Sequence, residues 1–460
     1  MSGGTGGETY YVTTPIYYVN DAPHIGHAYT SLACDALARF MRLDGRRVMF
    51  LTGTDEHGQK VEKSAQAAGL DPQQFTDRVS ENFRRLADAM AFTNDDFIRT
   101  TEPRHIAAAQ ALWRRLEEQG EIYLGSYDGW YAVRDEAFYS EAETTVDAAG
   151  QRRGPTGAEV EWVSEPSYFF RLSAWGDRLL AFYRDNPRFI APESRRNEVV
   201  RFVEGGLQDL SVSRTTFSWG VPAPGVDGHI LYVWLDALTN YMTAVDYPDE
   251  TSERYQAFWP ADLHMVGKDI LRFHAVYWPA FLMAADLPPP KRVFAHGWWT
   301  NEGQKISKSL GNVIDPFALM EDFGRDAVRY FLLREVPFGN DGDFSRRAMI
   351  GRVNGDLAND FGNLAQRTLS MIAKNCGGVA PTPGAPTPED AALLDAAGAL
   401  PETLRSLMED QQFNRALEAI WAVVGEANRY VAQQARWTLK KTDPPRTVSA
   451  SVYNTISIRG

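Results

Sequence analysis

The chain has 460 residues, 44% of them hydrophobic and 23% charged, and a formal net charge of −13 at pH 7. This composition is typical of a soluble globular protein and excludes a disordered or fibrous chain, while the length predicts two to four domains rather than one core. The acidic balance lacks the basic footprint of most nucleic-acid-binding proteins, although local patches can still bind RNA.

The sequence shows no sign of export or membrane insertion. No apolar run approaches the roughly 18 residues that span a bilayer, and residues 1–8 have neither the basic nor the apolar region of a signal peptide. The only cysteines are Cys34 and Cys376, far apart, which indicates a reducing compartment. We therefore expect a cytoplasmic protein whose partners include neither a membrane nor DNA.

The first 60 residues predict a strand, a helix and a second strand. Residues 9–19 are aromatic and β-branched and read as a buried strand that Pro15 makes irregular near its end. Residues 28–45 have helical periodicity and stop at Gly45, and residues 46–58 begin as a short apolar strand and run into polar residues. Such a unit predicts a parallel sheet with a ligand site at the carboxyl edge of its strands.

Between the first strand and the helix lies Pro23-His24-Ile25-Gly26-His27. Three interpretations are open: an ordinary helix start, two imidazoles that share a metal ion, or a phosphate site. A helix N-terminus attracts phosphate through its free N–H groups and its dipole. His24 and His27 can donate to phosphoryl oxygens, and Gly26 leaves room for a nucleotide to approach the backbone.

The following elements alternate until a helical tail begins. Helices are predicted over 71–90 and 103–119, and segment 121–225, rich in Gly, Tyr and Trp, predicts an inserted module that is mainly irregular and β-rich. Strand and helix patterns resume in "HILYVWLDALTNYM", "DLHMVGKDILRFHAVYWPAFLMAA" and "RVFAHGWW". From about 346 the pattern is helical, interrupted by a Pro/Gly-rich linker at 377–390.

A second candidate motif, Lys305-Ile306-Ser307-Lys308-Ser309, follows the last predicted strand. Two lysines three residues apart, among serines and glycines, suit a mobile loop that closes over a polyphosphate and offsets charge on a pyrophosphate leaving group. The alternative is a solvated surface loop. The two motifs together are much more specific than either alone.

These motifs resemble those of a known family. "HIGH" after a first strand and "KISKS" after a last one are similar to the paired signatures of class I aminoacyl-tRNA synthetases. The segments "TTPIYYVN", "GTDEHGQK", "YVWLDALTNYM", "GKDILRFHAVYWPAFL" and "FAHGW" look like the motifs of methionyl-tRNA synthetases, and the likeness extends from about residue 9 to 443.

The resemblance implies an α/β fold: a Rossmann-like parallel-sheet catalytic domain split by an inserted module and followed by an α-helical anticodon-binding bundle. It places the catalytic domain at 1–119 and 229–345, the inserted module at 120–228 and the bundle at 346–460. Catalysis would use His24, His27, Lys305 and Lys308. The substrate Mg-ATP would be bound by His24, Gly26, His27, His296 and Lys308.

The resemblance also implies a methionine site. Asp55 would pair with the α-ammonium group, although the same carboxylate could simply cap the helix after "GT". The positions that match this site are Ile16, Tyr18, Asp55, Arg214, Trp234, Ala237, Leu238, Tyr241, Ile270 and His274. Spacing alone predicts only that Trp234, Leu238 and Tyr241 share a buried helix face.

For tRNA(Met), the family's anticodon-reading positions match Asn363, Arg367 and Trp437. Asn363 and Arg367 lie four residues apart on one face of a predicted helix, and Trp437 is either a stacking surface or a packing residue. The last residues, "PRTVSASVYNTISIRG", are short and poorly periodic. We therefore expect an incomplete bundle and weakened anticodon discrimination, with methionine activation retained.

The pattern departs from many relatives in the inserted module. Where those proteins carry zinc-binding cysteines, this chain has Ala132, Val133 and neighbours without thiolates, so no bound zinc or other metal is expected. This resembles the zinc-free subgroup, and a monomer is expected.

Three rival functions remain open from sequence. A metal hydrolase could use His24, His27, Asp55 and His57, but it leaves the second motif and the tail unexplained. A non-catalytic RNA-binding homologue is disfavoured because both signature motifs are intact. A class I synthetase for leucine or valine is disfavoured because the inserted module leaves little room for an editing domain.

Overall fold

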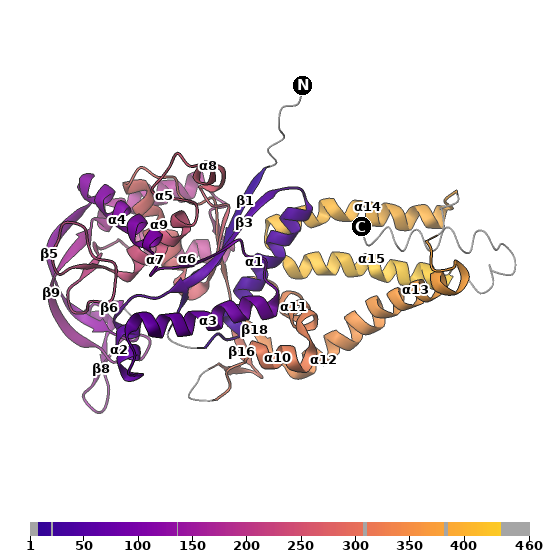
Figure 1. Cartoon of the computed structure of the whole chain (residues 1–460), viewed down its shortest axis with the longest axis horizontal. Coiled ribbons are helices and arrows are strands. Elements are labelled where there is room, and N and C mark those ends of the chain that lie inside the picture. Colours follow the sequence, from indigo (N-terminus) through magenta and orange to yellow (C-terminus); the bar gives the residue numbers. More distant parts are fainter. Residues whose placement is uncertain (1–7, 20–21, 136, 307–310, 381–384, 434–460) are drawn as a thin grey trace, which may run out of the picture. The chain divides into compact units, whose positions relative to one another are not determined.

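The structure is a computed structural model that describes residues 8–19, 22–135, 137–306, 311–380 and 385–433 (Figure 1). The chain divides into two compact units, Met1–His296 and Gly297–Gly460, and each is described by itself. Among the helices in these ranges, none is long and apolar enough to cross a membrane.

The first unit is built on a parallel sheet, as the sequence predicted. Its strands follow the order β10-β15-β14-β1-β3-β2, with β4 paired to β3. They are β1 (Thr9–Thr13), β2 (Tyr17–Tyr18), β3 (Arg47–Asp55), β4 (Asp96–Arg99), β10 (Ile190–Ala191), β14 (Leu263–Gly267) and β15 (Val293–His296). Because every pairing is parallel, the carboxyl ends of β3 and β15 lie at the same edge.

The helices of this unit connect the strands. They are α1 (Ile25–Leu43), α2 (Gln59–Ala67), α3 (Pro72–Met90), α4 (Pro103–Glu118), α5 (Gly176–Asp185), α6 (Glu193–Glu204), α7 (Val233–Thr243), α8 (Glu253–Phe258) and α9 (Trp278–Ala284), with a π-helical turn at Phe273–Tyr277 before α9. Short 3-10 turns lie at Glu141–Glu143, Leu172–Trp175 and Lys268–Ile270. The predicted strand 9–19 is two strands, because the chain leaves β1 at Thr14 and rejoins the sheet at β2. Gly45 ends α1 with φ +89, as its predicted role after the helix requires.

Segment 121–225 is only partly β-structure. A four-stranded antiparallel sheet has the order β11-β9-β5-β6. Two separate two-stranded sheets, β7-β8 and β12-β13, are formed by neighbouring parts of the sequence. Its strands are β5 (Ile122–Ala132), β6 (Ala137–Tyr139), β7 (Thr145–Val146), β8 (Arg152–Arg153), β9 (Glu161–Phe170), β11 (Leu210–Ser211), β12 (Ser213–Arg214) and β13 (Ile230–Leu231). The prediction of a mainly irregular, β-rich segment was wrong for α5 and α6, and β10 joins the parallel sheet through β15.

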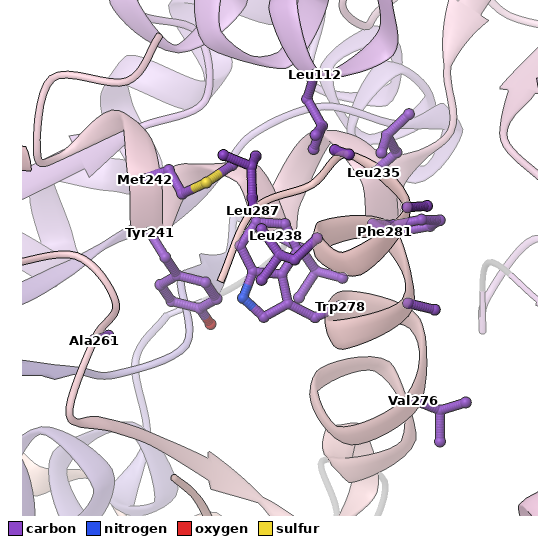
Figure 2. Packing of buried hydrophobic residues seen from close by; sticks show 14 of the residues in the cluster. Leu112, Leu235, Leu238, Tyr241, Met242, Ala261, Val276, Trp278, Phe281 and Leu287 are labelled. Atoms are coloured by element: carbon purple, nitrogen blue, oxygen red, sulfur yellow. The ribbon is translucent and has the colours of Figure 1, made fainter. Parts of the chain in front are cut away.

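The core of the first unit lies among its helices and the parallel sheet. Figure 2 shows Leu112 of α4, Leu235 and Leu238 of α7, and Trp278 and Phe281 near one another in this cluster. The indole of Trp278 is fully buried, and its ring centroid lies 6.2 Å from that of Tyr241. The helix α7 is therefore fixed by apolar packing over most of its length.

The second unit combines a small sheet with helices. Strand β16 (Trp299–Asn301) pairs with β17 (Gln304–Lys305) and β18 (Gly342–Phe344). The helices are α10 (Pro316–Phe323), α11 (Arg325–Arg334), α12 (Arg346–Arg352), α13 (Asn363–Asn375), α14 (Pro388–Glu409) and α15 (Phe413–Gln433), and a π-helical stretch, Val353–Gly362, joins α12 to α13. Helices α14 and α15 lie side by side (Figure 1). The predicted helical tail is confirmed up to Gln433.

Candidate active site

The side chains of His24 and His27 cap the N-terminus of α1, and each accepts a hydrogen bond from a backbone N–H of the first turn or of the residue before it. The Nδ1 atom of His24 accepts from the N–H of Gly26 at 3.1 Å, and Nδ1 of His27 accepts from the N–H of His24 at 3.0 Å. The two rings lie 3.9 Å apart between centroids. A nitrogen that accepts carries no proton, so each neutral ring holds its proton on Nε2 and can donate from there.

Burial keeps both rings neutral. It lowers the pKa of His27 well below the ordinary value, and the neighbouring charge of His24 adds to the effect. Burial also lowers the pKa of His24, with partial opposition from the carboxylate of Asp269. The helix N-terminus thus presents two neutral N–H donors, one from Nε2 of each ring.

The cap has little room for a side chain at Gly26. A Cβ atom at Gly26 would lie 2.9 Å from Cε1 and 3.1 Å from Nδ1 of His24. The ring would have to move, and the bond from Gly26 N–H to His24 would be lost. The glycine therefore has a local structural role that the sequence interpretation did not include.

His296 lies against the second turn of α1. Its Nε2 atom is 2.7 Å from the hydroxyl of Thr30, its ring meets that of Tyr29 edge-on at 5.3 Å, and its side chain is buried. Three of the residues assigned to ATP by resemblance, His24, His27 and His296, are thus near the same helix terminus.

Asp55 ends β3 at the carboxyl edge of the sheet. It is buried, and its backbone pairs with Tyr18 of β2 and accepts from the N–H of Val19 at 3.1 Å. Asp55 and Tyr18, both assigned to methionine, are therefore neighbours across two strands.

The residue after Asp55 is an anchor. The carboxylate of Glu56 accepts two bonds from the guanidinium of Arg99, at 2.7 and 2.9 Å, and further bonds from the hydroxyls of Thr54 and Thr101. Its carbonyl accepts from the indole N–H of Trp219 at 2.6 Å. These donors compensate the cost of burying the Glu56 carboxylate. The same bonds fix the position of the chain directly after Asp55.

His57 and Asp236 form a further anchor. Nδ1 of His57 lies 2.7 Å from Oδ2 of Asp236, and Oδ1 of Asp236 lies 2.7 Å from Nε2 of His105. Sequence reasoning quoted Glu56 and Asp236 within motifs but gave them no role, because their partners are far away along the chain. The only local feature that could have predicted a buried role was the carboxylate of Asp236 within an otherwise apolar helix pattern.

Helix α7 carries four residues of the assigned methionine set. Ala237, Leu238 and Tyr241 are buried, and the half-buried indole of Trp234 stacks on Phe273 at 3.4 Å between centroids. The phenol of Tyr241 lies 2.6 Å from Nε2 of His274. Aromatic walls of this kind suit a polarisable thioether.

His274 is fixed in one tautomer. Its Nδ1 lies 3.0 Å from the carbonyl oxygen of Ile270, which only accepts, so Nδ1 carries the proton and Nε2 accepts from the hydroxyl of Tyr241. Burial lowers the pKa of His274 to about 4, against smaller opposing effects of the Ile270 carbonyl and of Asp269. Three of the assigned residues, Tyr241, Ile270 and His274, are thus in one hydrogen-bonded chain.

The low pKa of His274 predicts a pH-dependent stability. An unfolded histidine titrates near 6.5, so between pH 6.5 and about 4 the unfolded chain binds more protons than the folded one. The stabilisation is present above pH 6.5 and is lost as the pH falls, by on the order of 2 kcal/mol between pH 7 and 5. Thermal unfolding of wild type and His274→Asn across this range should show a smaller pH-dependent fall in the variant. Parallel profiles would contradict the prediction.

Arg214 is a buried arginine on β12, the partner strand of β13, which leads into α7. Its Nη1 donates to the hydroxyl of Ser211 at 2.6 Å and to the carbonyl of Ser213 at 2.8 Å. Its guanidinium lies 4.2 Å from the ring centroid of Tyr232, which precedes α7. The remaining assigned residue, Ile16, is half-buried and packs against the main core.

In the second unit, Lys305 is exposed at the end of β17, and its carbonyl accepts from the side-chain amide of Asn312 at 3.1 Å. Lys308 lies outside the described residues.

Asn363 and Arg367 are exposed on α13, and Nε of Arg367 donates to the carbonyl of Asn363 at 3.2 Å. Trp437 lies outside the described residues. The amide oxygen of Asn428, a residue that sequence reasoning missed, accepts from Nη2 of Arg367 at 3.0 Å.

Between β5 and β9 of the inserted segment, two carboxylates accept hydrogen bonds from residues nearby in the sequence. Asp135 accepts from the hydroxyls of Tyr139 and Thr156, and Asp147 accepts from the guanidinium of Arg153 at 2.7 Å and from two backbone N–H groups. Within the ranges that the structure describes, no group of three or more His, Cys, Asp or Glu side chains could hold a metal ion.

Comparison with known proteins gives one consistent result. The family model for class I tRNA synthetases (M) matches residues 10–369. The methionine–tRNA ligase of Brucella suis biovar 1 (strain 1330) is 59% identical over 456 residues, which is 98% of this chain and 88% of the relative. That of Mesorhizobium japonicum is 60% identical over 439 residues, 95% of this chain and 85% of the relative.

A solved structure is similar throughout. The Mycobacterium tuberculosis methionyl-tRNA synthetase in complex with methionyl-adenylate superposes with a TM-score of 0.95 at 54% identity, covering 98% of this chain and 90% of the other. The apo form of the same synthetase superposes with a TM-score of 0.88 at 51% identity, covering 98% of this chain and 88% of the other.

Proposed function

This chain belongs to the methionyl-tRNA synthetases of class I, and on that premise we propose that it converts L-methionine and Mg-ATP to methionyl-adenylate and transfers the methionyl group to the 3′ end of tRNA(Met). The product would serve initiation and elongation of translation. The relationship covers nearly the whole chain at 59% identity and includes a structural neighbour that binds methionyl-adenylate.

The observation that supports activation most directly is the paired histidine cap of α1. His24 and His27 each have Nδ1 committed to a backbone N–H, so each is a neutral donor through Nε2. Together the two Nε2–H groups form an array of donors with no acceptor nitrogen to spare. Such an array matches a phosphate chain.

The proposed reaction has two steps. A carboxylate oxygen of methionine attacks the α-phosphorus of ATP, the α–β bridging bond breaks, and pyrophosphate leaves. A ribose hydroxyl at the 3′ end of the tRNA then attacks the adenylate carbonyl, and AMP leaves. In this scheme His24 and His27 bind phosphate, Lys305 and Lys308 offset the charge on the pyrophosphate, and His296 lies near the adenine.

For the amino acid, we propose that Asp55 binds the α-ammonium group, which a carboxylate can neutralise. The side chain would be bound by Trp234, Ala237, Leu238, Tyr241 and His274 with Ile16, Tyr18, Ile270 and Arg214 around them. The bonded pair Tyr241–His274 and the stacked Trp234 support this assignment. For the anticodon, Asn363, Arg367 and Trp437 are proposed, supported by the shared face of the first two.

The metal-hydrolase alternative needs imidazole nitrogens that carry no proton and are free to face a metal ion. Nδ1 of His24 and of His27 accept backbone N–H groups, and Nδ1 of His57 is bonded to Asp236. These commitments favour the synthetase.

The function is tested by ATP–pyrophosphate exchange with each of the twenty amino acids, without tRNA. Exchange with methionine alone is expected, followed by charging of tRNA(Met) when tRNA is added. Exchange with another amino acid only, or with none, would overturn the proposal. A reaction without amino acid is the control for ATP hydrolysis.

We also propose that the part of the inserted segment between β5 and β9 needs no zinc, because Asp135 and Asp147 already stabilise it by hydrogen bonds with Tyr139 and Arg153. Prolonged dialysis against a chelator, followed by return of Mg²⁺, should leave the melting temperature and the exchange rate unchanged. Asp135→Ala should lower the melting temperature without a response to added zinc. A fall on chelation that zinc alone reverses would contradict this proposal.

The wider assignments follow from the same function. The proposed domains are a catalytic domain at 1–119 and 229–345, an inserted module at 120–228 and an anticodon-binding bundle at 346–460. A translation enzyme of this kind acts in the cytoplasm on methionine, ATP and tRNA(Met), and we propose that it does so as a monomer. Sedimentation of the purified chain tests the oligomeric state.

A further inference from the structure

Three buried polar side chains from three separate elements meet at α7. His57 follows β3, His105 belongs to α4, and Asp236 lies in the first turn of α7. The carboxylate of Asp236 is fully buried and accepts one bond of 2.7 Å from each imidazole. We call these three residues the His–Asp–His cluster, and none of them has a role in the reaction proposed above.

His105 contacts α7 at two positions, Asp236 and Thr243. Nδ1 of His105 lies 3.2 Å from the hydroxyl of Thr243, seven residues after Asp236. The single hydroxyl proton of Thr243 can go to Nδ1 of His105 or to the carbonyl of Thr239, which is 3.1 Å away. One imidazole therefore spans two turns of the helix, which fixes both its rotation and its position along its axis.

The cluster lies on the face of α7 opposite to the proposed methionine face. At 100° per residue, Asp236, Thr239 and Thr243 centre about 170° from the direction of Trp234, Leu238 and Tyr241. All three polar residues are buried. Asp236 thus stabilises α7 on the face that points away from the proposed methionine site, and it is not placed to contact the amino acid itself.

The other end of the cluster leads to Asp55. His57 is two residues after Asp55, and between them the carboxylate of Glu56 is fixed by Arg99. The bond from His57 to Asp236 therefore joins the strand end that carries the proposed ammonium-binding carboxylate to the helix that carries the proposed side-chain pocket.

The carboxylate form of Asp236 is stable here. Burial alone would raise its pKa, but the charge and hydrogen bonds of His57 and His105 outweigh burial and lower the pKa to about 2. An amide at this position has one acceptor oxygen and one donor nitrogen, so one of the two imidazoles would face an N–H group where it now faces an acceptor.

We propose that Asp236 is a positioning residue for methionine: through His57 and His105 it sets the distance between the ammonium-binding carboxylate of Asp55 and the side-chain pocket on α7. The proposal rests on the function proposed above. Loss of the cluster should weaken binding of an amino acid that must reach both places, and it should leave ATP binding, which depends on α1, largely unchanged.

The test uses the full-length chain in ATP–pyrophosphate exchange. Asp236→Asn is expected to raise KM for methionine about ten-fold or more, while KM for ATP changes less than about two-fold. The matched control is Asp35→Asn, because Asp35 is also a fully buried carboxylate, bonded to Arg39 and to Thr93, away from the methionine face. The control should lower the melting temperature and leave both KM values unchanged.

Conservative replacements provide a second test that does not depend on Asp236→Asn folding well. In His57→Asn and His105→Gln, an amide nitrogen can stand where the donating ring nitrogen stands, so KM for methionine should stay near wild type. His57→Ala and His105→Ala should raise it. Equal KM values in each Asn/Ala and Gln/Ala pair would overturn the proposal.

The possible failures are distinguishable. If wild type shows no methionine-dependent exchange, the proposed function is wrong and this inference falls with it. If wild type is active but Asp236→Asn keeps its KM for methionine, or changes only as Asp35→Asn does, the inference alone is overturned.

Discussion

Lys308→Ala is expected to slow methionyl-adenylate formation by about 10²–10³-fold while the Kd for methionine changes by less than about three-fold. The physical reason is that the ammonium group is proposed to act on charge that appears only as the α–β bond of ATP breaks. An interaction made in the transition state, and not with bound substrate, appears in the rate and not in binding.

The measurement is single-turnover formation of the adenylate at saturating methionine and ATP, beside equilibrium binding of methionine. Lys63→Ala is the matched control, because Lys63 is an exposed lysine on α2 outside the proposed machinery. It should retain the wild-type rate. Equal losses of rate and methionine affinity in Lys308→Ala would argue against a role in the transition state.

Asp55→Ala is expected to raise KM for methionine by about 100-fold and to leave the affinity for ATP within a few-fold. A charge-assisted hydrogen bond to a partner at a buried site contributes on the order of 3 kcal/mol, and removal of the carboxylate leaves the ammonium group of the substrate without its counter-ion. Asp55→Asn keeps the shape without the charge and should be nearly as impaired.

Exchange kinetics with methionine and ATP varied separately give both constants. Asp71→Asn removes an exposed carboxylate that caps α3, and it serves as the control for a general change in charge. Loss of ATP affinity with normal methionine affinity in Asp55→Ala would show that Asp55 was assigned to the wrong substrate.

Local patterns predicted most of the elements that frame this site. Periodicity and an end signal at Gly45 predicted α1, and the aromatic, β-branched run predicted β1, because both depend on residues close in sequence. The same reasoning missed α5 and α6, since Gly- and aromatic-rich texture around them outweighed their short helical patterns.

The site was predicted in part, and the missing part is long-range. The helix spacing of Leu238 and Tyr241 predicted that they are buried, which the structure confirms, but it could not assign a ligand to them. The partners of Asp236 lie 179 and 131 residues away in sequence. No short-range pattern encodes such a contact, because it depends on how helices pack and not on how each one forms.

The reciprocal cap of His24 and His27 limits what chemistry this end of α1 can support. With each Nδ1 held by a backbone N–H and each ring kept neutral by burial, neither imidazole has a basic nitrogen with which to remove a proton. An inhibitor aimed here should therefore offer acceptor oxygens, such as sulfonyl or phosphonate groups, whereas an amidine or amine would meet only N–H groups of its own polarity.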